Sequence, residues 1–127
     1  MEPLYLDTHA AVWLYAGHTE VFSARTLKLI ETSTLLISPF VLLELQFLRE
    51  TGKVRLKVDT FLREMKEELG LKLCESPFAS VALEAVRMSW TRDPFDRMIV
   101  AQAAVNEARL VTRDREILKH YHEALWD

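Results

Sequence analysis

The chain has 127 residues, half of them hydrophobic and 28% charged, with a net charge of −3, which predicts one folded domain over residues 1–127 and excludes a disordered chain. The negative charge argues against a basic protein that coats nucleic acid, but not against an enzyme whose carboxylates bind metal ions, because those cations would offset the charge. Cys74, the single cysteine, excludes an internal disulfide, and the absence of a signal-peptide pattern or of an apolar run of about 20 residues predicts a cytoplasmic protein without a membrane span.

Short apolar segments alternate with segments of helical periodicity along the whole chain. Ser23 and Pro39 suit the starts of helices, and Gly52 and Gly70 suit their ends. The predicted strands are residues 3–6, 34–38, 71–74, 109–112 and, at an edge, 124–126. The predicted helices are residues 8–17, a second one beginning at Ser23, then 39–52, 58–69, 79–88, 94–108 and 114–121. This alternation predicts an α/β fold, with a central parallel sheet of four or five strands covered by helices on both faces.

Several apolar and aromatic side chains are predicted to pack rather than to bind a ligand. Those at helical spacing within residues 58–69 are expected to face the core: Phe61, Leu62, Met65 and Leu69. The tryptophans are interpreted as core residues rather than as platforms that stack a base: Trp13, Trp90 and Trp126. Cys74 is interpreted as structural. His120 and His122 are expected to lie on the surface rather than to bind zinc, since no cysteine or further histidine lies near them. His9, which lies beside Asp7 and could act in proton transfer, is expected instead to be packed or on the surface.

Four acidic residues are predicted to meet at one edge of the sheet. Asp7 directly follows the first predicted strand, and Asp114 follows the fourth by two residues. In open parallel sheets, ligands bind beyond the carboxyl ends of the strands. Glu44 interrupts the apolar segment PFVLLELQFL, where an unpaired carboxylate would be costly to bury. Asp96 lies in the first turn of an apolar helix that begins at Pro94.

Such a cluster of carboxylates predicts a site for a divalent cation. Like charges repel one another, and protons or cations relieve that repulsion. Carboxylate oxygens suit hard cations, chiefly Mg²⁺ and Mn²⁺. A metal ion there could polarise a phosphoryl oxygen, so the pattern indicates hydrolysis of a phosphodiester.

Helix capping is an alternative interpretation of most of these acids. The segment Asp93-Pro94-Phe95-Asp96 matches a helix start, with Asp93 as N-cap and Pro94 at the first helical position. Asp114 could cap the last helix, and Asp7 could end a strand. Capping does not explain Glu44, so the acids are more informative together than singly.

The segments that contain these acids form an ordered series: YLDTHAAVWL at the start, ISPFVLLELQFL near residue 40, RDPFDRMIVAQA near residue 95 and LVTRD at 110–114. In this series the chain resembles, nearly end to end, the PIN-domain ribonucleases, and in particular the VapC toxins of bacterial and archaeal toxin–antitoxin pairs. The resemblance maps the four acids of the family onto Asp7, Glu44, Asp96 and Asp114. Asp93 is the alternative for the third acid, and Asp96 is favoured because it directly precedes the apolar run of its helix.

The resemblance implies a three-layer α/β/α PIN-like fold and cleavage of RNA (tRNA, rRNA or mRNA) with Mg²⁺ or Mn²⁺. It also implies inhibition by a cognate antitoxin protein and assembly into a homodimer. Asp7 and Asp96 are expected to make the principal metal contacts, with Glu44 and Asp114 completing the site directly or through water. Residues expected to position the carboxylates are Thr8, Asp93 and Thr112. Residues that could hold RNA phosphates, or could instead form a solvated face or salt bridges, are Arg92, Arg97, Arg113 and Arg115.

Two other functions fit part of the pattern. A receiver-like domain that binds Mg²⁺ has a similar length and alternation, but it would need an acidic pair after the first strand and a lysine after a late one. This chain has a single acid, Asp7, at the first place and Arg113-Asp114 at the second. A non-catalytic interaction module would use the acids only to bind a basic partner peptide. Metal-dependent cleavage of RNA would distinguish a nuclease from each of these two functions.

Overall fold

The computed structural model describes all 127 residues and contains a five-stranded sheet in which every neighbouring pair is parallel, as expected. The strand order is β3-β2-β1-β4-β5, so the first strand is central and the third and fifth are edges. The strands are β1 (Pro3–Leu6), β2 (Thr34–Ile37), β3 (Lys72–Leu73), β4 (Arg109–Val111) and β5 (Ala124–Leu125).

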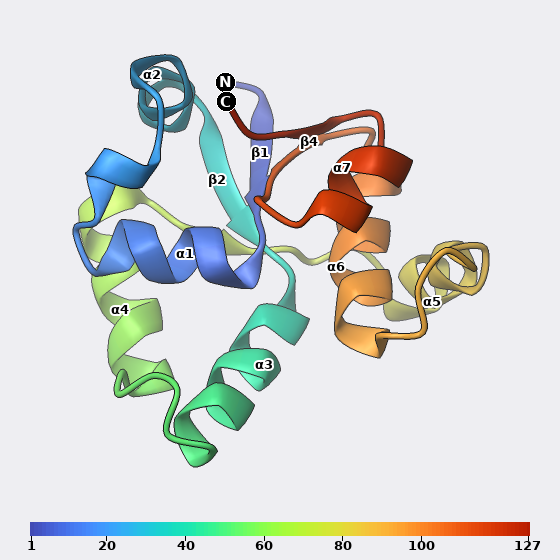
Figure 1. Cartoon of the computed structure of the whole chain (residues 1–127), viewed down its shortest axis with the longest axis horizontal. Coiled ribbons are helices and arrows are strands. Elements are labelled where there is room, and N and C mark those ends of the chain that lie inside the picture. Colours follow the sequence, from blue (N-terminus) through green and yellow to red (C-terminus); the bar gives the residue numbers. More distant parts are fainter.

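Helices lie on both sides of the sheet, with α1, α2 and α4 on one side of the strands in Figure 1 and α5, α6 and α7 on the other. The chain therefore forms the expected three layers, helices, sheet and helices. No helix combines the length and the apolar character that a membrane crossing would require. The helices are α1 (Thr8–Tyr15), a short 3₁₀ helix η1 (Thr19–Val21), α2 (Ala24–Thr32), α3 (Pro39–Glu50), α4 (Val58–Leu69), α5 (Phe78–Val86), α6 (Pro94–Ala104) and α7 (Arg115–His120).

The central strand explains why the predicted strands are continuous apolar runs rather than alternating ones. Leu4, Tyr5 and Leu6 are all buried, because helices cover both faces of β1. Hydrogen bonds to β2 on one side and β4 on the other satisfy its backbone. The carboxyl end of β1 thus lies between two other strand ends, and any residue that directly follows it is central.

The predicted helix over residues 94–108 is too long, since α6 ends at Ala104. The backbone N–H groups of Asn106 and Ala108 both bond to the carbonyl of Ala103, which closes the helix in a tight turn. Glu107 takes a left-handed conformation there, with φ of 50°, that sequence periodicity does not reveal. This turn allows Arg109 to enter β4 directly. The prediction also missed η1, which has no side-chain cap to mark it.

The prediction that Leu69 faces the core is wrong. Phe61 and Met65 are fully buried, but the side chain of Leu69 is 42% exposed. Gly70, with φ of 68°, ends α4 in the left-handed conformation and turns the chain back towards the sheet. Leu71, just beyond that turn, is the buried residue instead.

Replacing Phe61 with alanine should lower the free energy of unfolding by about 3–5 kcal/mol, because the change opens a cavity in a packed core. Leu69→Ala, in the same helix, is the matched control and should change it by no more than about 0.5 kcal/mol. Urea denaturation followed by circular dichroism measures both. Equal losses from the two substitutions would contradict the packing described here.

Candidate active site

Asp7 is fixed by hydrogen bonds on both of its carboxylate oxygens. It follows β1 directly and caps α1, where Oδ1 accepts the backbone N–H of Ala10 at 3.1 Å. Oδ2 accepts the hydroxyl of Thr112, which follows β4. The side chain is only 8% exposed. The ends of the two central strands therefore hold this carboxylate in one orientation.

Glu44 reaches the same region from α3, the helix that follows β2. Ser38 caps that helix by accepting the backbone N–H of Phe40, and Pro39 occupies its first turn. The half-buried Glu44 carboxylate accepts the hydroxyl of Thr8, the buried first residue of α1. Glu44 was expected to need a partner, and that partner is the hydroxyl of Thr8 rather than a cationic side chain.

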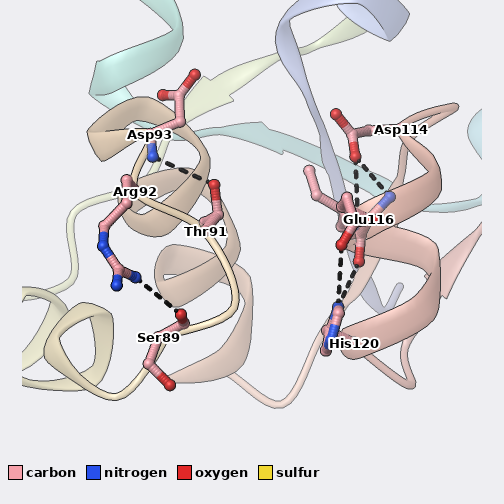
Figure 2. A network of polar contacts seen from close by, with 8 residues as sticks. Ser89, Thr91, Arg92, Asp93, Asp114, Glu116 and His120 are labelled. Atoms are coloured by element: carbon pink, nitrogen blue, oxygen red, sulfur yellow. Dashed lines mark hydrogen bonds and ion pairs between the residues drawn. The ribbon is translucent and has the colours of Figure 1, made fainter.

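Asp93 and Asp114 both act as helix caps, as the alternative interpretation predicted. Oδ1 of Asp93 accepts the backbone N–H groups of Phe95 and Asp96 at 2.8 and 3.2 Å. Oδ1 of Asp114 accepts those of Glu116 and Ile117 at 2.9 and 3.1 Å. Figure 2 shows the two acids at the starts of their helices. Capping occupies one oxygen of each carboxylate and leaves the other available.

Five carboxylates, those of Asp7, Glu44, Asp93, Asp96 and Asp114, line one pocket of about 440 Å³. None of them forms an ion pair with a lysine, arginine or histidine. The structure thus brings all four predicted acids together, with Asp93 beside them. The remaining lining residues are Thr8, His9, Trp13, Ile99, Arg113 and Ile117.

Two of these carboxyl groups, Asp96 and Asp7, have raised pKa values, so the site disfavours their charged forms. The pKa of Asp96 is raised to about 7, first by burial and then by the nearby negative charges of Asp93, Asp114, Glu44 and Asp7. Burial also raises the pKa of Asp7, against the hydrogen bonds from Thr112 and Ala10 that favour its charged form. The pocket therefore concentrates negative charge that the protein itself does not neutralise.

This set of donors fits a hard divalent cation. All the groups are carboxylates or hydroxyls, which Mg²⁺ and Mn²⁺ prefer. No three acidic, histidine or cysteine side chains are already arranged as a metal cage. Mg²⁺ does not require one, because it usually keeps several waters and takes one or two carboxylates directly. The pocket can therefore hold the ion partly through water.

The four arginines proposed for RNA phosphate differ in their surroundings, and only Arg113 lines the pocket. Arg92 donates to the carbonyl of Ser89 and is directed away from the Asp93 carboxylate (Figure 2). Arg97 donates to the carbonyl of Thr91 at 2.8 Å and holds the loop that precedes α6. Arg115 is exposed outside the pocket. Their role towards phosphate stays a prediction.

Sequence reasoning favoured packing or surface positions for His9 and Trp13, but both line the pocket. They lie one helical turn apart on α1, immediately after the acid that caps it, and that spacing was the available signal. The ring of His120 stacks on Trp90 at 5.1 Å, and its Nδ1 lies 3.0 Å from the carbonyl of Glu116.

Comparisons with known proteins bear on the family and the fold of this chain. The family model described as "PIN domain" matches residues 4–123. The chain is 28% identical over 124 residues to "Ribonuclease VapC22" of Mycobacterium tuberculosis, which covers 96% of this chain and 95% of that protein. It is also similar in fold to a chain of VapBC2 from Rickettsia felis bound to a promoter DNA fragment, with a TM-score of 0.69, 19% identity and coverage of 98% and 99%. For VapBC-1 from nontypeable Haemophilus influenzae, the TM-score is 0.65, with 16% identity and coverage of 98% and 96%.

Without metal ions, the pocket should make the protein less stable as the pH rises. The unfolded chain releases the proton of Asp96 near its ordinary pKa of 3.8, whereas the folded chain keeps it up to about pH 7. The folded state therefore binds more protons between these values, and stability falls across that range. Thermal unfolding in EDTA between about pH 5 and about pH 8 measures the slope.

Asp96→Asn should flatten this slope, whereas Asp59→Asn, at the exposed start of α4, should leave it unchanged. Added Mg²⁺ should raise the melting temperature more at the higher pH. If Asp96→Asn kept the slope of the unaltered chain, the pH dependence of stability would not come from the Asp96 carboxyl group.

Proposed function

This chain belongs to the PIN-domain family, and from that premise we propose that it is a metal-dependent endoribonuclease, the toxin of a toxin–antitoxin pair. The observation that carries the proposal is the pocket of five carboxylates without a cationic partner at the carboxyl ends of the strands. The likeness to a protein named as a ribonuclease over 96% of the chain supports the same activity. We expect it to act on tRNA, rRNA or mRNA in the cytoplasm.

Each acid of the pocket then has a defined task. A bound Mg²⁺ or Mn²⁺ would supply the positive charge that polarises a phosphoryl oxygen. Asp7 and Asp96 would hold it most directly, and Glu44 and Asp114 would contact it directly or through water. Thr112 keeps Asp7 in one orientation, and Thr8 does so for Glu44. Asp93 would position Asp96, since its side chain accepts the backbone N–H of that residue.

The geometry favours a nuclease over a receiver-like domain. A single acid follows β1, Ser38 follows β2, and Arg113 stands near the end of β4 where a lysine would be needed. An interaction module that only binds a basic peptide is compatible with the pocket. Such a module needs negative charge, but it does not need the carboxylates to be held in fixed orientations. The buried hydroxyl contacts to Asp7 and Glu44 fix orientations, which metal binding needs and simple charge attraction does not.

We further propose that a cognate antitoxin protein regulates the enzyme through this pocket. Two of the solved structures similar in fold are VapBC complexes. A basic side chain from a partner would relieve the same repulsion among the carboxylates that a divalent cation relieves. Antitoxin and metal would therefore compete, and binding of the partner would stop cleavage.

A homodimer is the assembly that best explains the exposed apolar residues of α3 and α5. Phe78, Leu83 and Val86 of α5 are 68%, 68% and 72% exposed, and Leu43 and Phe47 of α3 are also exposed. Large apolar side chains that are exposed near one another mark interaction sites on many soluble proteins. The stacked rings of Phe40 and Phe78 join the two helices into one face.

Asp7→Asn and Asp96→Asn should each reduce metal-dependent cleavage of RNA by at least about 100-fold, because each removes a negative ligand without changing the volume of the side chain. Cleavage of total cellular RNA in Mg²⁺, with EDTA as a blank, measures the loss. Asp59→Asn is the matched control and should cleave at the normal rate. Normal cleavage by Asp96→Asn would rule out the proposed site.

Leu83→Glu should convert the dimer to a monomer, raising its dissociation constant by about tenfold or more, because a charge would be buried in an apolar interface. Sedimentation at several protein concentrations measures this constant. Leu69→Glu, an exposed apolar position on α4, is the control and should leave the assembly intact. A monomeric unaltered chain, or a Leu83→Glu dimer of normal strength, would contradict this interface.

A further inference from the structure

A single polar side chain interrupts the buried stretch of α6. Residues 98–103 of that helix are all buried, and Gln102 is the only one of them that is polar. The residue is 4% exposed. A buried amide costs free energy unless it is hydrogen-bonded, and an apolar residue of similar volume would avoid that cost. The presence of a glutamine here therefore depends on the partner that its amide contacts.

That partner is Ser38, the residue that caps α3. The Ser38 hydroxyl donates to Oε1 of Gln102 at 2.7 Å, although the two residues are 64 positions apart in the sequence. The same Ser38 oxygen accepts the backbone N–H of Phe40 and so caps the helix. Ser38 is 1% exposed, so water does not compete for the bond. One hydroxyl therefore links the start of α3 to the last turns of α6.

This hydrogen bond lies at one end of the contact between α3 and α6. At the other end, the ring of Phe47 packs against that of Phe95, with centroids 5.4 Å apart. The start of each helix thus meets the end of the other, so the two helices run in opposite directions. Glu44 and Asp96 each lie between these two contacts along their own helix, and both line the pocket of five carboxylates.

The bond between Ser38 and Gln102 gives the pair of helices a fixed placement. Apolar packing is non-directional, so the aromatic contact at the far end constrains their relative position less. The hydroxyl of Thr8 holds the Glu44 carboxylate, but Thr8 belongs to α1 and does not tie Glu44 to α6. A buried hydrogen bond whose partners are both satisfied selects one arrangement of the elements that it joins.

We propose that Gln102 is a positioning residue for the metal site, which acts through Ser38 to set the placement of Glu44 relative to Asp96. This inference rests on the proposed metal-dependent function. Gln102 does not line the pocket, so it would act without touching the cation. Mg²⁺ demands near-ideal octahedral geometry, and carboxylates on two loosened helices would first have to be brought into place. Loss of the bond therefore weakens metal binding rather than the chemical step.

Asn106, just beyond the end of α6, offers a matched control. Its amide donates to the hydroxyls of Tyr5 and Ser76 and to the backbone carbonyl of Gln102, each at 2.9 Å. These bonds join α6 to β1 and to the segment after β3, and none of them reaches α3. If Gln102 only stabilised the fold, its loss and the loss of the Asn106 amide would have the same kind of effect.

The experiment follows the melting temperature as Mg²⁺ is added, which reports metal binding without cleavage. Gln102→Met keeps the approximate volume but loses the acceptor, and it should raise the Mg²⁺ concentration for half of the stabilising effect by at least about tenfold. Ser38→Gly removes the same bond from the other side, at a position where glycine is tolerated as a cap, and should act similarly. The double variant should shift this concentration no further than either single one, because both remove one bond.

Asn106→Ala should lower the melting temperature in EDTA and leave the half-effective Mg²⁺ concentration unchanged. Cleavage of RNA should show the same division. Gln102→Met should need at least about tenfold more Mg²⁺ for half-maximal cleavage, yet at saturating Mg²⁺ its rate should lie within about threefold of normal. Ser38→Gly alone decides the outcome if Gln102→Met does not fold.

The proposal is overturned if the variants of Gln102 and Ser38 leave the half-effective Mg²⁺ concentration unchanged, or if Asn106→Ala shifts it as much. It is also overturned if the double variant multiplies the two single shifts, or if Mg²⁺ does not stabilise the unaltered chain. An unaltered chain that Mg²⁺ stabilises but that cleaves no RNA would refute the proposed enzyme instead. The shift in Mg²⁺ concentration would still decide the role of Gln102.

Discussion

Repulsion among carboxylates at the ends of parallel strands is the constraint around which this molecule is arranged. Left alone, five such groups in one pocket would move apart or take up protons. The chain holds them with neutral hydrogen bonds instead of with cations. Asp7, Asp93 and Asp114 each accept backbone N–H groups at the start of a helix, where the partial positive charge of the helix end also favours an anion. The same hydrogen bonds therefore cap the helices and fix the carboxylates of the pocket.

Asp96 differs from these three acids, because its side chain does not cap a helix. It lies in the first turn of α6 rather than at its cap, and its pKa rises to about 7 through burial and through the charge of its neighbours. Hydrogen bonds hold the carboxylates of the other four acids, although burial still raises the pKa of Asp7, whereas Asp96 is left to be satisfied from outside. In the proposed function, a divalent cation would do so when substrate is to be cut. A basic side chain from a partner would do so when it is not.

Most of this arrangement follows from local features of the sequence. Asp7 and Asp114 follow predicted apolar strands, which pair in parallel in the structure, and Glu44 is conspicuous because it interrupts an apolar helix. What the sequence could not reveal depends on contacts between distant segments. The sequence predicted the end of α4 at Gly70, but it did not show that Leu71, just beyond the turn, is buried in place of Leu69.

The arginines and tryptophans illustrate the same limit. Arg92, Arg97 and Arg113 are alike in sequence, each lying within a few residues of an acid. Arg92 and Arg97 donate to backbone carbonyls, whereas Arg113 lies against two indole rings from the two ends of the chain. Trp126 in particular is 113 positions from the ring that it packs against, since 126 − 13 = 113. Hydrophobicity alone predicts burial for both rings and cannot show which side stays open.

The two sides of the pocket impose different requirements on one ligand. The acidic floor attracts a cation, and through it a phosphate, without regard to the base attached. The wall of His9, Trp13 and Arg113 offers flat faces and a planar cation, for which a phosphate alone is a poor match. The aromatic side is rigid, because Trp13 packs against Trp126, which in turn packs against the buried Phe22.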